Sequence, residues 1–279
     1  MKNKNKYCGT VLFVGLPNAG KSTLLNSIIK QKISIVSPKV QTTKDQISGV
    51  FNKDKTQIIF TDTPGIIEKR KFYNKHYARM TFNKDIDVDL NCIIVDLQKD
   101  INDKNIESLN SFSKKFKKNF LVLNKIDLVS NKKMLEVSSL LNSKLNFLET
   151  FFISAKKNKG IEYFIDRVAK YIPQREWLYE NDILTDKGIK YQISEITREK
   201  IFNLLNKEIP YTTEINTMIE DKKEICTIYQ DILVLKESQK SIIIGKNGEK
   251  IKMIGSRARL DIEKLLKKKI FLNLIVKKK

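Results

Sequence analysis

A glycine-containing octapeptide near the N-terminus has the spacing of a phosphate-binding loop. It reads Gly15-Leu16-Pro17-Asn18-Ala19-Gly20-Lys21-Ser22, follows the apolar run Val11–Val14, and leads through Thr23 into a helix-length stretch. In such a strand–loop–helix context, backbone N–H groups wrap phosphates and the helix N-terminus favours their negative charge. We expect Lys21 to neutralise the β- and γ-phosphates and the Ser22 hydroxyl to bind Mg²⁺.

Two later segments could complete the magnesium site. Asp62-Thr63-Pro64-Gly65, followed by Ile66, comes at the end of an apolar run, so Asp62 is placed to hold Mg²⁺ through a water and Gly65 to sense the γ-phosphate. The segment between this motif and the phosphate loop contains Gln41-Thr42-Thr43-Lys44, whose hydroxyls could reach Mg²⁺ when γ-phosphate is present. We favour Thr43 as the ligand, with Thr42 as a close alternative that the sequence does not separate from it.

Two further motifs predict recognition of guanine. Asn124-Lys125-Ile126-Asp127 follows the apolar run Phe120–Leu123, and the Asp127 carboxylate can accept N–H bonds from N1 and N2 of guanine. Adenine lacks this donor pair, so the residue selects GTP or GDP over adenine nucleotides. Ser154-Ala155-Lys156 is expected to offer a backbone N–H to guanine O6. Each motif alone is weak evidence, but this order and spacing indicate one guanine-nucleotide site.

The position where many related switches carry a water-orienting glutamine is aliphatic, with Ile66 and Ile67 after the DxxG motif. An aliphatic side chain cannot position water, so we predict hydrolysis that is slow or that is assisted by another group or a bound cation. Asn18 is a candidate ligand for K⁺. The alternative, which the sequence leaves open, is that Asn18 only stabilises the loop by hydrogen bonding.

From Thr10 to about Tyr171, short apolar runs alternate with amphipathic stretches of helix length. This pattern predicts an α/β fold with a mostly parallel sheet, whose ligands bind at the carboxyl ends of the strands. Together with the motifs above, it indicates a P-loop GTPase domain. We expect strands at Val11–Val14, Ile58–Phe60, Cys92–Val95, Phe120–Leu123 and Phe151–Ile153, and helices at 104–117, 131–146 and 160–171.

A break at Ile172-Pro173-Gln174-Arg175 separates this domain, residues 1–173, from a linker at 174–190 and a second domain at 191–279. The second domain has the order α-β-β-α-α-β of a small α+β domain. Its expected elements are a helix at 191–206, strands at Thr212–Ile219 and Ile225–Leu235, helical stretches at Ser238–Ile244, 249–254 and 256–267, and a strand at Ile270–Val276.

A GxxG loop, Gly245-Lys246-Asn247-Gly248, lies between two of these helices. The glycines let an RNA backbone approach, and we expect contacts from the loop, from Ile244, and from Lys250 and Lys252. GxxG alone is usually just a turn. Residues 236–279, however, contain fourteen Lys and Arg against four Asp and Glu, a net charge of +10, which favours RNA.

The net charge of the whole chain, +21, has two interpretations. It predicts a polyanionic partner, but 46 of the 53 basic residues are Lys, which could instead reflect a low-GC genome. The cysteines, Cys8, Cys92 and Cys226, have no metal-site or redox spacing and indicate free thiols in a reducing cytoplasm. No apolar segment approaches the ~20 residues of a membrane span, so any membrane contact should be peripheral.

The motifs together resemble the Era GTPase family over nearly the whole chain. The matching segments are GLPNAGKST, QTTK, DTPG, NKID, ISAK, EWLYENDILTD, SEITREKIF, IPYTTEI and QKSIIIGKNGEKIKMIGSRARLDIEKLL. The resemblance implies a C-terminal KH domain of the second type, binding near the 3′ end of small-subunit ribosomal RNA, and a role in assembling the small ribosomal subunit. It also implies peripheral contact with the inner membrane, and we expect a monomer.

The chain departs from that family in two places. It stops at Lys277-Lys278-Lys279, where family members often continue with basic residues and a Trp, and Glu68–Lys84 matches only loosely. Two alternative functions are an RNA-binding adaptor whose nucleotide is structural and a membrane-associated switch with incidental RNA affinity. The presence of Lys21, Ser22 and Asp62 argues against the adaptor.

Overall fold

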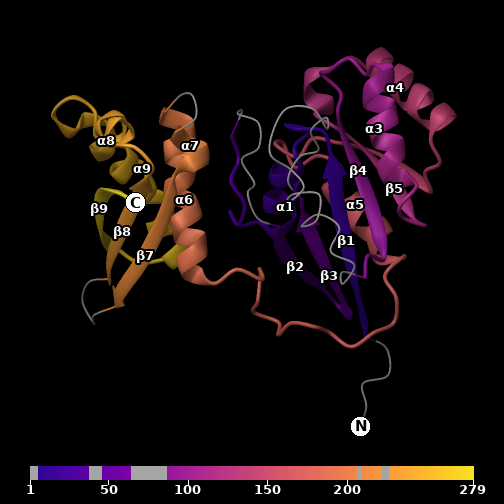
Figure 1. Ribbon diagram of the computed structural model, residues 1–279. Helices are drawn as coiled ribbons and strands as arrows, with labels where there is room; N and C mark the ends of the chain where they lie inside the picture. The colour runs from indigo at the N-terminus through magenta and orange to yellow at the C-terminus, as the bar shows by residue number, and fades with distance from the viewer. Residues whose placement is uncertain (1–5, 38–45, 64–86, 206–208, 222–225) are drawn as a thin grey trace, which may run out of the picture. The chain divides into compact units, whose positions relative to one another are not determined.

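The computed structural model describes residues 6–37, 46–63, 87–205, 209–221 and 226–279 (Figure 1). The chain forms two compact units, and the boundary along the main chain falls between Asp186 and Lys187. Within the described ranges, no helix combines the length and the apolar character that crossing a bilayer requires.

The first unit is built on a six-stranded sheet in the order β2-β3-β1-β4-β5-β6. All neighbouring strands are parallel except β2 and β3, which form an antiparallel hairpin. The predicted mostly parallel sheet and its five apolar strands are confirmed, whereas β2 was not predicted because its apolar residues are interrupted by Ser, Gly and Asn. The strands are β1 Tyr7–Gly15, β2 Ile47–Lys53, β3 Thr56–Asp62, β4 Leu90–Asp96, β5 Asn119–Asn124 and β6 Glu149–Ile153.

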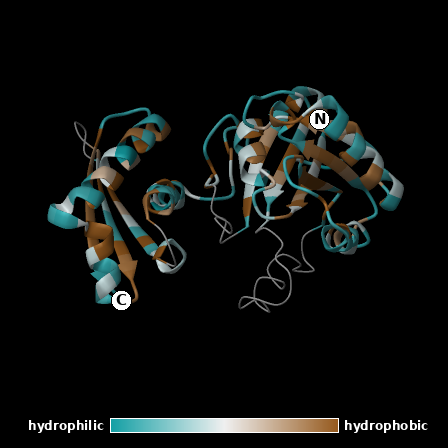
Figure 2. Cartoon of the chain, turned by 90° about the horizontal axis from the view of Figure 1, so that it is seen from above, coloured by the Kyte–Doolittle hydropathy of each residue, from teal (hydrophilic) through white to brown (hydrophobic). Residues whose placement is uncertain are grey.

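Helices cover both faces of this sheet. Ile93 and Leu121, on β4 and β5, pack against α3 (Asp103–Ser113) and α4 (Asn131–Lys144). Phe13 and Phe60 meet Phe164 of α5 (Ile161–Ala169), with ring centroids 5.3 to 6.5 Å apart. The remaining helix, α1 (Lys21–Ile29), buries Leu24 and Leu25. Figure 2 shows hydrophobic colour concentrated on the strands and hydrophilic colour on the outer faces of the helices. This layering brings the carboxyl ends of β1, β4 and β5 to one edge.

The segment that follows α5 packs against the first unit as far as Asp186. The side chain of Gln57, which is fully buried in β3, accepts the backbone N–H groups of Leu178 and Tyr179 at 2.9 and 3.0 Å. Further along, the Ser48 N–H donates to Asp186 Oδ1 at 2.9 Å. The segment therefore runs along the β2–β3 hairpin as irregular backbone, which explains why its sequence shows no periodicity.

The second unit has a three-stranded sheet, β7-β8-β9, with β7 and β8 antiparallel and β8 and β9 parallel. The predicted order α-β-β-α-α-β is confirmed, with a short additional helix, α7, before β7. Its elements are α6 Ile189–Leu204, α7 Ile209–Thr212, β7 Glu214–Asp221, β8 Cys226–Val234, α8 Glu237–Ile244, η2 Lys246–Gly248, α9 Glu249–Leu266 and β9 Ile270–Lys278.

The helical stretches expected at 249–254 and 256–267 form one continuous helix, α9, which includes Gly255. Gly255 lies inside α9, and a Cβ added there would come within 3.3 Å of the Leu274 side chain on β9. The glycine therefore permits close packing of the helix on the sheet, where Ile254 contributes to the core.

Candidate functional site

The phosphate loop connects the end of β1 at Gly15 to the start of α1 at Lys21. Lys21 is only 6% exposed, and its Nζ donates to the carbonyl oxygens of Gly15 and Leu16 at 3.2 and 3.3 Å. Burial lowers the pKa of Lys21; the negative charge of Asp62 acts against this shift, and the positive charge of Lys99 adds to it. The Lys21 ammonium group is therefore enclosed by the loop. Because water is largely excluded there, its attraction for a bound phosphate would be strong.

Two glycines of this loop are required by their surroundings. Gly20 has φ +97°, and a Cβ there would lie 2.2 Å from Nδ2 of Asn124. At Gly15, a Cβ would lie 2.3 Å from the carbonyl oxygen of Ile94 on the neighbouring strand β4. Asn18, at the outer turn of the loop, also has a positive φ of 63°, which Asn tolerates better than most residues.

The predicted magnesium ligands Ser22 and Asp62 lie side by side. Ser22 Oγ donates to Asp62 Oδ2 at 2.5 Å, and Asp62 is fully buried at the end of β3. Next to it, the Thr63 hydroxyl donates to the carbonyl of Phe13 at 2.8 Å. A hydroxyl and a carboxylate are the hard oxygen donors that Mg²⁺ prefers, so this pair fits the ion.

Several predicted residues of the phosphate and magnesium sites lie outside the described residues. They are the switch residues Gln41, Thr42, Thr43 and Lys44, and the residues Pro64, Gly65, Ile66 and Ile67.

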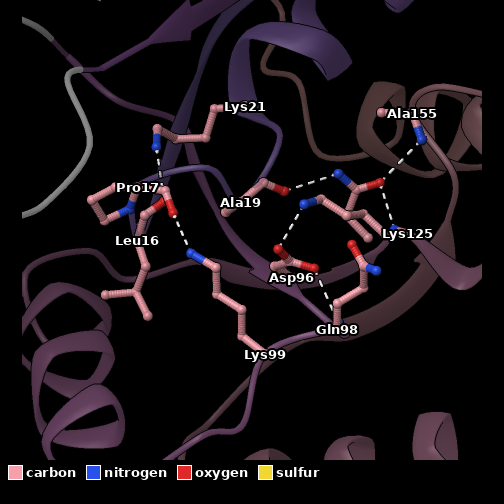
Figure 3. A network of polar contacts seen from close by, with 10 residues as sticks. Leu16, Pro17, Ala19, Lys21, Asp96, Gln98, Lys99, Lys125 and Ala155 are labelled. Carbon is pink, nitrogen blue, oxygen red and sulfur yellow. Dashed lines mark hydrogen bonds and ion pairs between the residues drawn. The ribbon is translucent and has the colours of Figure 1, made fainter. Parts of the chain in front are cut away.

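Asn124, at the end of β5, connects three of the predicted motifs (Figure 3). Its Nδ2 donates to the carbonyl of Ala19 at 2.9 Å, and its Oδ1 accepts the N–H groups of Lys125 and Ala155 at 2.8 and 3.0 Å. The amide of Asn124 is thus engaged with the backbone, and it holds the phosphate loop, the NKxD motif and the segment at 154–156 together.

Asp96, at the end of β4, belongs to the same network, although its role was not predicted from the sequence. Its Oδ2 accepts from Lys125 Nζ at 2.6 Å, and its Oδ1 accepts the Gln98 N–H at 3.0 Å (Figure 3). Asp96 is 6% exposed, so the ion pair fixes the Lys125 side chain along the site. The available signal was an acidic residue directly after the buried run Cys92–Val95.

Asp127 lies in the short helix η1 (Ile126–Leu128) and is partly exposed. A hydrogen bond with Ser154 lowers the pKa of Asp127, and the charges of Lys157 and Lys156 lower it further. The carboxylate is therefore ionised near neutral pH and can accept two N–H groups of a base. Ile126 packs against the core beneath it.

A second unpredicted residue reaches the phosphate loop. Lys99, in the turn after β4, donates from Nζ to the carbonyl oxygen of Pro17 at 3.0 Å (Figure 3). No motif spacing singles out this lysine in the sequence.

In the second unit, the GxxG loop lies at the surface between α8 and α9. Gly245 and Gly248 have φ of +74° and +77°, and no atom lies within 4 Å of a Cβ placed at Gly248. Lys246, Asn247, Lys250 and Lys252 are exposed, whereas Ile244 is half-buried against the core. The backbone of the loop is therefore open to a polyanion at Gly248, whereas the side chain of Lys250 lies against Gly245.

Two family models match the chain. One, described as a 50S ribosome-binding GTPase, matches residues 10–125, and the other, described as a KH domain, matches residues 193–279. The first match contains the phosphate loop, Asp62 and Asn124 and ends before Asp127 and the segment 154–156, and the second contains the GxxG loop.

Full-length comparisons reach proteins named GTPase Era. The chain is 37% identical to the protein from Syntrophus aciditrophicus over 272 residues, covering 96% of this chain and 89% of the relative. It is 39% identical to that from Trichlorobacter lovleyi over 279 residues, covering 99% and 94%. A solved structure of Era with MgGDPNP and nucleotides 1506–1542 of 16S ribosomal RNA has a TM-score of 0.90 at 33% identity, covering 99% of this chain and 94% of that one. An Aquifex aeolicus Era variant bound to GDP and AlF4⁻ also has a TM-score of 0.90 at 33% identity, covering 98% and 94%.

Proposed function

The chain belongs to the GTPase Era family. We therefore propose that it is a GTP-hydrolysing switch that binds small-subunit ribosomal RNA and assists assembly of the small ribosomal subunit. One observation carries the nucleotide part of this proposal. The Asn124 side chain joins the phosphate loop to both base-recognition segments, so that a single nucleotide can meet all of them at once.

Each residue of the site has a chemical role in this proposal. Lys21 neutralises the β- and γ-phosphates, and Ser22 and Asp62 would hold Mg²⁺, which would supply further positive charge to the phosphate oxygens. Asp127 accepts the guanine N–H groups, and the segment 154–156 supplies a backbone N–H to O6, while the Ala155 N–H itself is bound by Asn124 Oδ1. Asn124 acts indirectly, because its amide holds the backbone of the other segments in position. Thr43 remains our choice for the γ-phosphate-dependent magnesium ligand.

Hydrolysis by this chain needs a group other than a glutamine, because Ile66 and Ile67 follow the DxxG motif. A K⁺ ion held by Asn18 would supply a positive charge beside the phosphates without a side chain from the switch segment. Asn18 lies in the loop between β1 and α1, so its side-chain oxygen would be near the phosphates bound by that loop.

The second unit supplies the RNA site in this proposal. Lys246, Lys250 and Lys252 contact the RNA phosphates while the two glycines admit the backbone. The charge of +10 in residues 236–279 supports a nucleic acid as the partner. The Era relative solved with nucleotides 1506–1542 of 16S ribosomal RNA suggests the 3′ region as the segment bound.

We extend the proposal to organisation and location. The GTPase domain spans 1–173, the linker 174–190 and the KH domain 191–279. The protein acts as a cytoplasmic monomer, with peripheral contact to the inner face of the cell membrane through its basic surface.

Two experiments test the function. The purified full-length chain should hydrolyse GTP in the presence of Mg²⁺, and Lys21→Ala should abolish turnover and sharply weaken nucleotide binding. Turnover of the variant at the wild-type rate would show that the phosphate loop is misassigned, and nucleotide binding by the wild type without turnover would favour the adaptor. Cross-linking the chain to RNA in cells, followed by sequencing, should enrich small-subunit ribosomal RNA; enrichment of other RNA classes alone would contradict the assembly role.

A further inference from the structure

Two lysines hold the phosphate loop by its carbonyl groups. Lys21 Nζ donates to the carbonyls of Gly15 and Leu16, and Lys99 Nζ donates to the next one, that of Pro17, at 3.0 Å. Figure 3 shows that the two ammonium groups approach this stretch of backbone from opposite sides. Lys21 comes from the side assigned to the phosphates, so Lys99 lies behind the loop.

The contact from Lys99 constrains the orientation of one peptide group. A peptide unit is planar and trans, so the carbonyl of Pro17 and the N–H of Asn18 point in opposite directions. Because the carbonyl points to Lys99, the Asn18 N–H points toward the side from which Lys21 approaches. This N–H is thereby directed at the place where the phosphates bind in the proposed function.

The charge of Lys99 also affects the strength of that donor. A cation at a carbonyl oxygen polarises the peptide group and makes its N–H a stronger donor. Hydrolysis of GTP moves negative charge onto the oxygen that leaves with GDP, and a donor already oriented toward that charge stabilises the transition state more than the ground state. The effect of Lys99 on the pKa of Lys21 indicates that its charge is felt inside the loop.

We propose that Lys99 is a positioning residue for GTP hydrolysis, which fixes and polarises the Pro17–Asn18 peptide so that the Asn18 N–H donates to the phosphate oxygens where charge accumulates. The inference rests on the proposed function, because it assigns a further residue to the same site. Lys99 acts through the peptide, and the reaction itself is carried by the groups named above.

The test separates turnover from affinity. Lys99→Met removes the ammonium group but keeps an unbranched side chain, and Lys99→Arg restores a cationic donor. Single-turnover rates should be measured with MgGTP, and dissociation constants with GDP and a non-hydrolysable GTP analogue. Lys104→Met is the matched control, since it removes one positive charge from the exposed first turn of α3, a few residues further on.

Lys99→Met should lower the rate of hydrolysis about tenfold, less than the loss of a whole oxyanion donor, while both dissociation constants change by less than about threefold. Lys99→Arg and Lys104→Met should stay close to the wild-type rate. Three results would overturn the inference while the proposed function stands. They are a wild-type rate of hydrolysis in Lys99→Met, a rate in Lys99→Arg as low as that in Lys99→Met, and dissociation constants of Lys99→Met that rise by the same factor as its rate falls. A wild-type chain that does not hydrolyse GTP would overturn both.

Discussion

Asn124 Nδ2 donates to the carbonyl oxygen of Ala19 at 2.9 Å, across 105 residues of sequence. Gly20, the next residue of the loop, has to lack a side chain because its Cβ would lie 2.2 Å from the same nitrogen. The segment that recognises the base and the loop that binds the phosphates are therefore fixed relative to one another by a direct hydrogen bond. A substitution at Asp127 leaves this hydrogen bond in place, so it should change base recognition without disturbing the phosphate loop.

Asp127→Asn should shift the preference of the site from GTP toward xanthosine triphosphate. The substitution turns two acceptor positions into one acceptor and one donor, which matches the carbonyl at C2 of xanthine instead of the guanine amino group. We expect GTP affinity to fall about 100-fold, the loss that accompanies about 2 to 3 kcal/mol for hydrogen bonds to a charged group. Competition binding of the two nucleotides measures the shift.

A matched control for this variant is Asp54→Asn, an exposed residue in the β2–β3 turn with φ 54°, a conformation that Asn tolerates. It removes the same charge away from the base site and should leave both affinities unchanged. Unchanged GTP affinity in Asp127→Asn would remove the base-site assignment.

If Asn18 holds a cation, hydrolysis should be faster in K⁺ than in Na⁺ at equal ionic strength. Asn18→Ala should erase the difference by lowering the rate in K⁺ to that in Na⁺, because the side-chain oxygen that binds the ion is lost. GDP affinity measured in Na⁺ serves as the control and should change little. Equal wild-type rates in the two salts would rule out the cation site.

The sequence predicted the parts of the fold that depend on local pattern. Apolar runs located five strands of the main sheet, and motif spacing brought Ser22 and Asp62 together, as their 2.5 Å contact shows. By contrast, Asp96 and Lys99 act through contacts with Lys125 and Pro17, which only the folded chain brings near. No motif singles out Lys99, and the one signal for Asp96, its position directly after the run Cys92–Val95, does not reveal that its partner is Lys125.

The same distinction explains the linker and α9. The segment bound by Gln57 is ordered by hydrogen bonds to an irregular backbone, which require no apolar periodicity. Gly255, which is locally unfavourable in a helix, lies inside α9 where a Cβ would come within 3.3 Å of the Leu274 side chain on β9, so its place depends on packing that the sequence does not show.

A double substitution in the GxxG loop tests whether one chain binds guanine nucleotide in its first unit and ribosomal RNA in its second. Lys246→Asp combined with Asn247→Asp places negative charge where RNA phosphates should lie. Each lost phosphate contact lowers the salt slope of log K by about 0.7 for a single strand, and the new repulsion weakens binding further. Lys269→Asp combined with Asn273→Asp carries the same charge change beyond the opposite end of α9 and is the matched control.

The measurement is a titration of single-stranded RNA from the 3′ end of small-subunit ribosomal RNA at several salt concentrations, with GTP affinity determined on the same samples. We predict that the loop variant loses RNA affinity and salt slope, that the control variant loses much less, and that GTP affinity is unchanged in both. RNA binding by the loop variant as tight as that of the wild type would contradict the assignment, and so would an equal loss of GTP affinity.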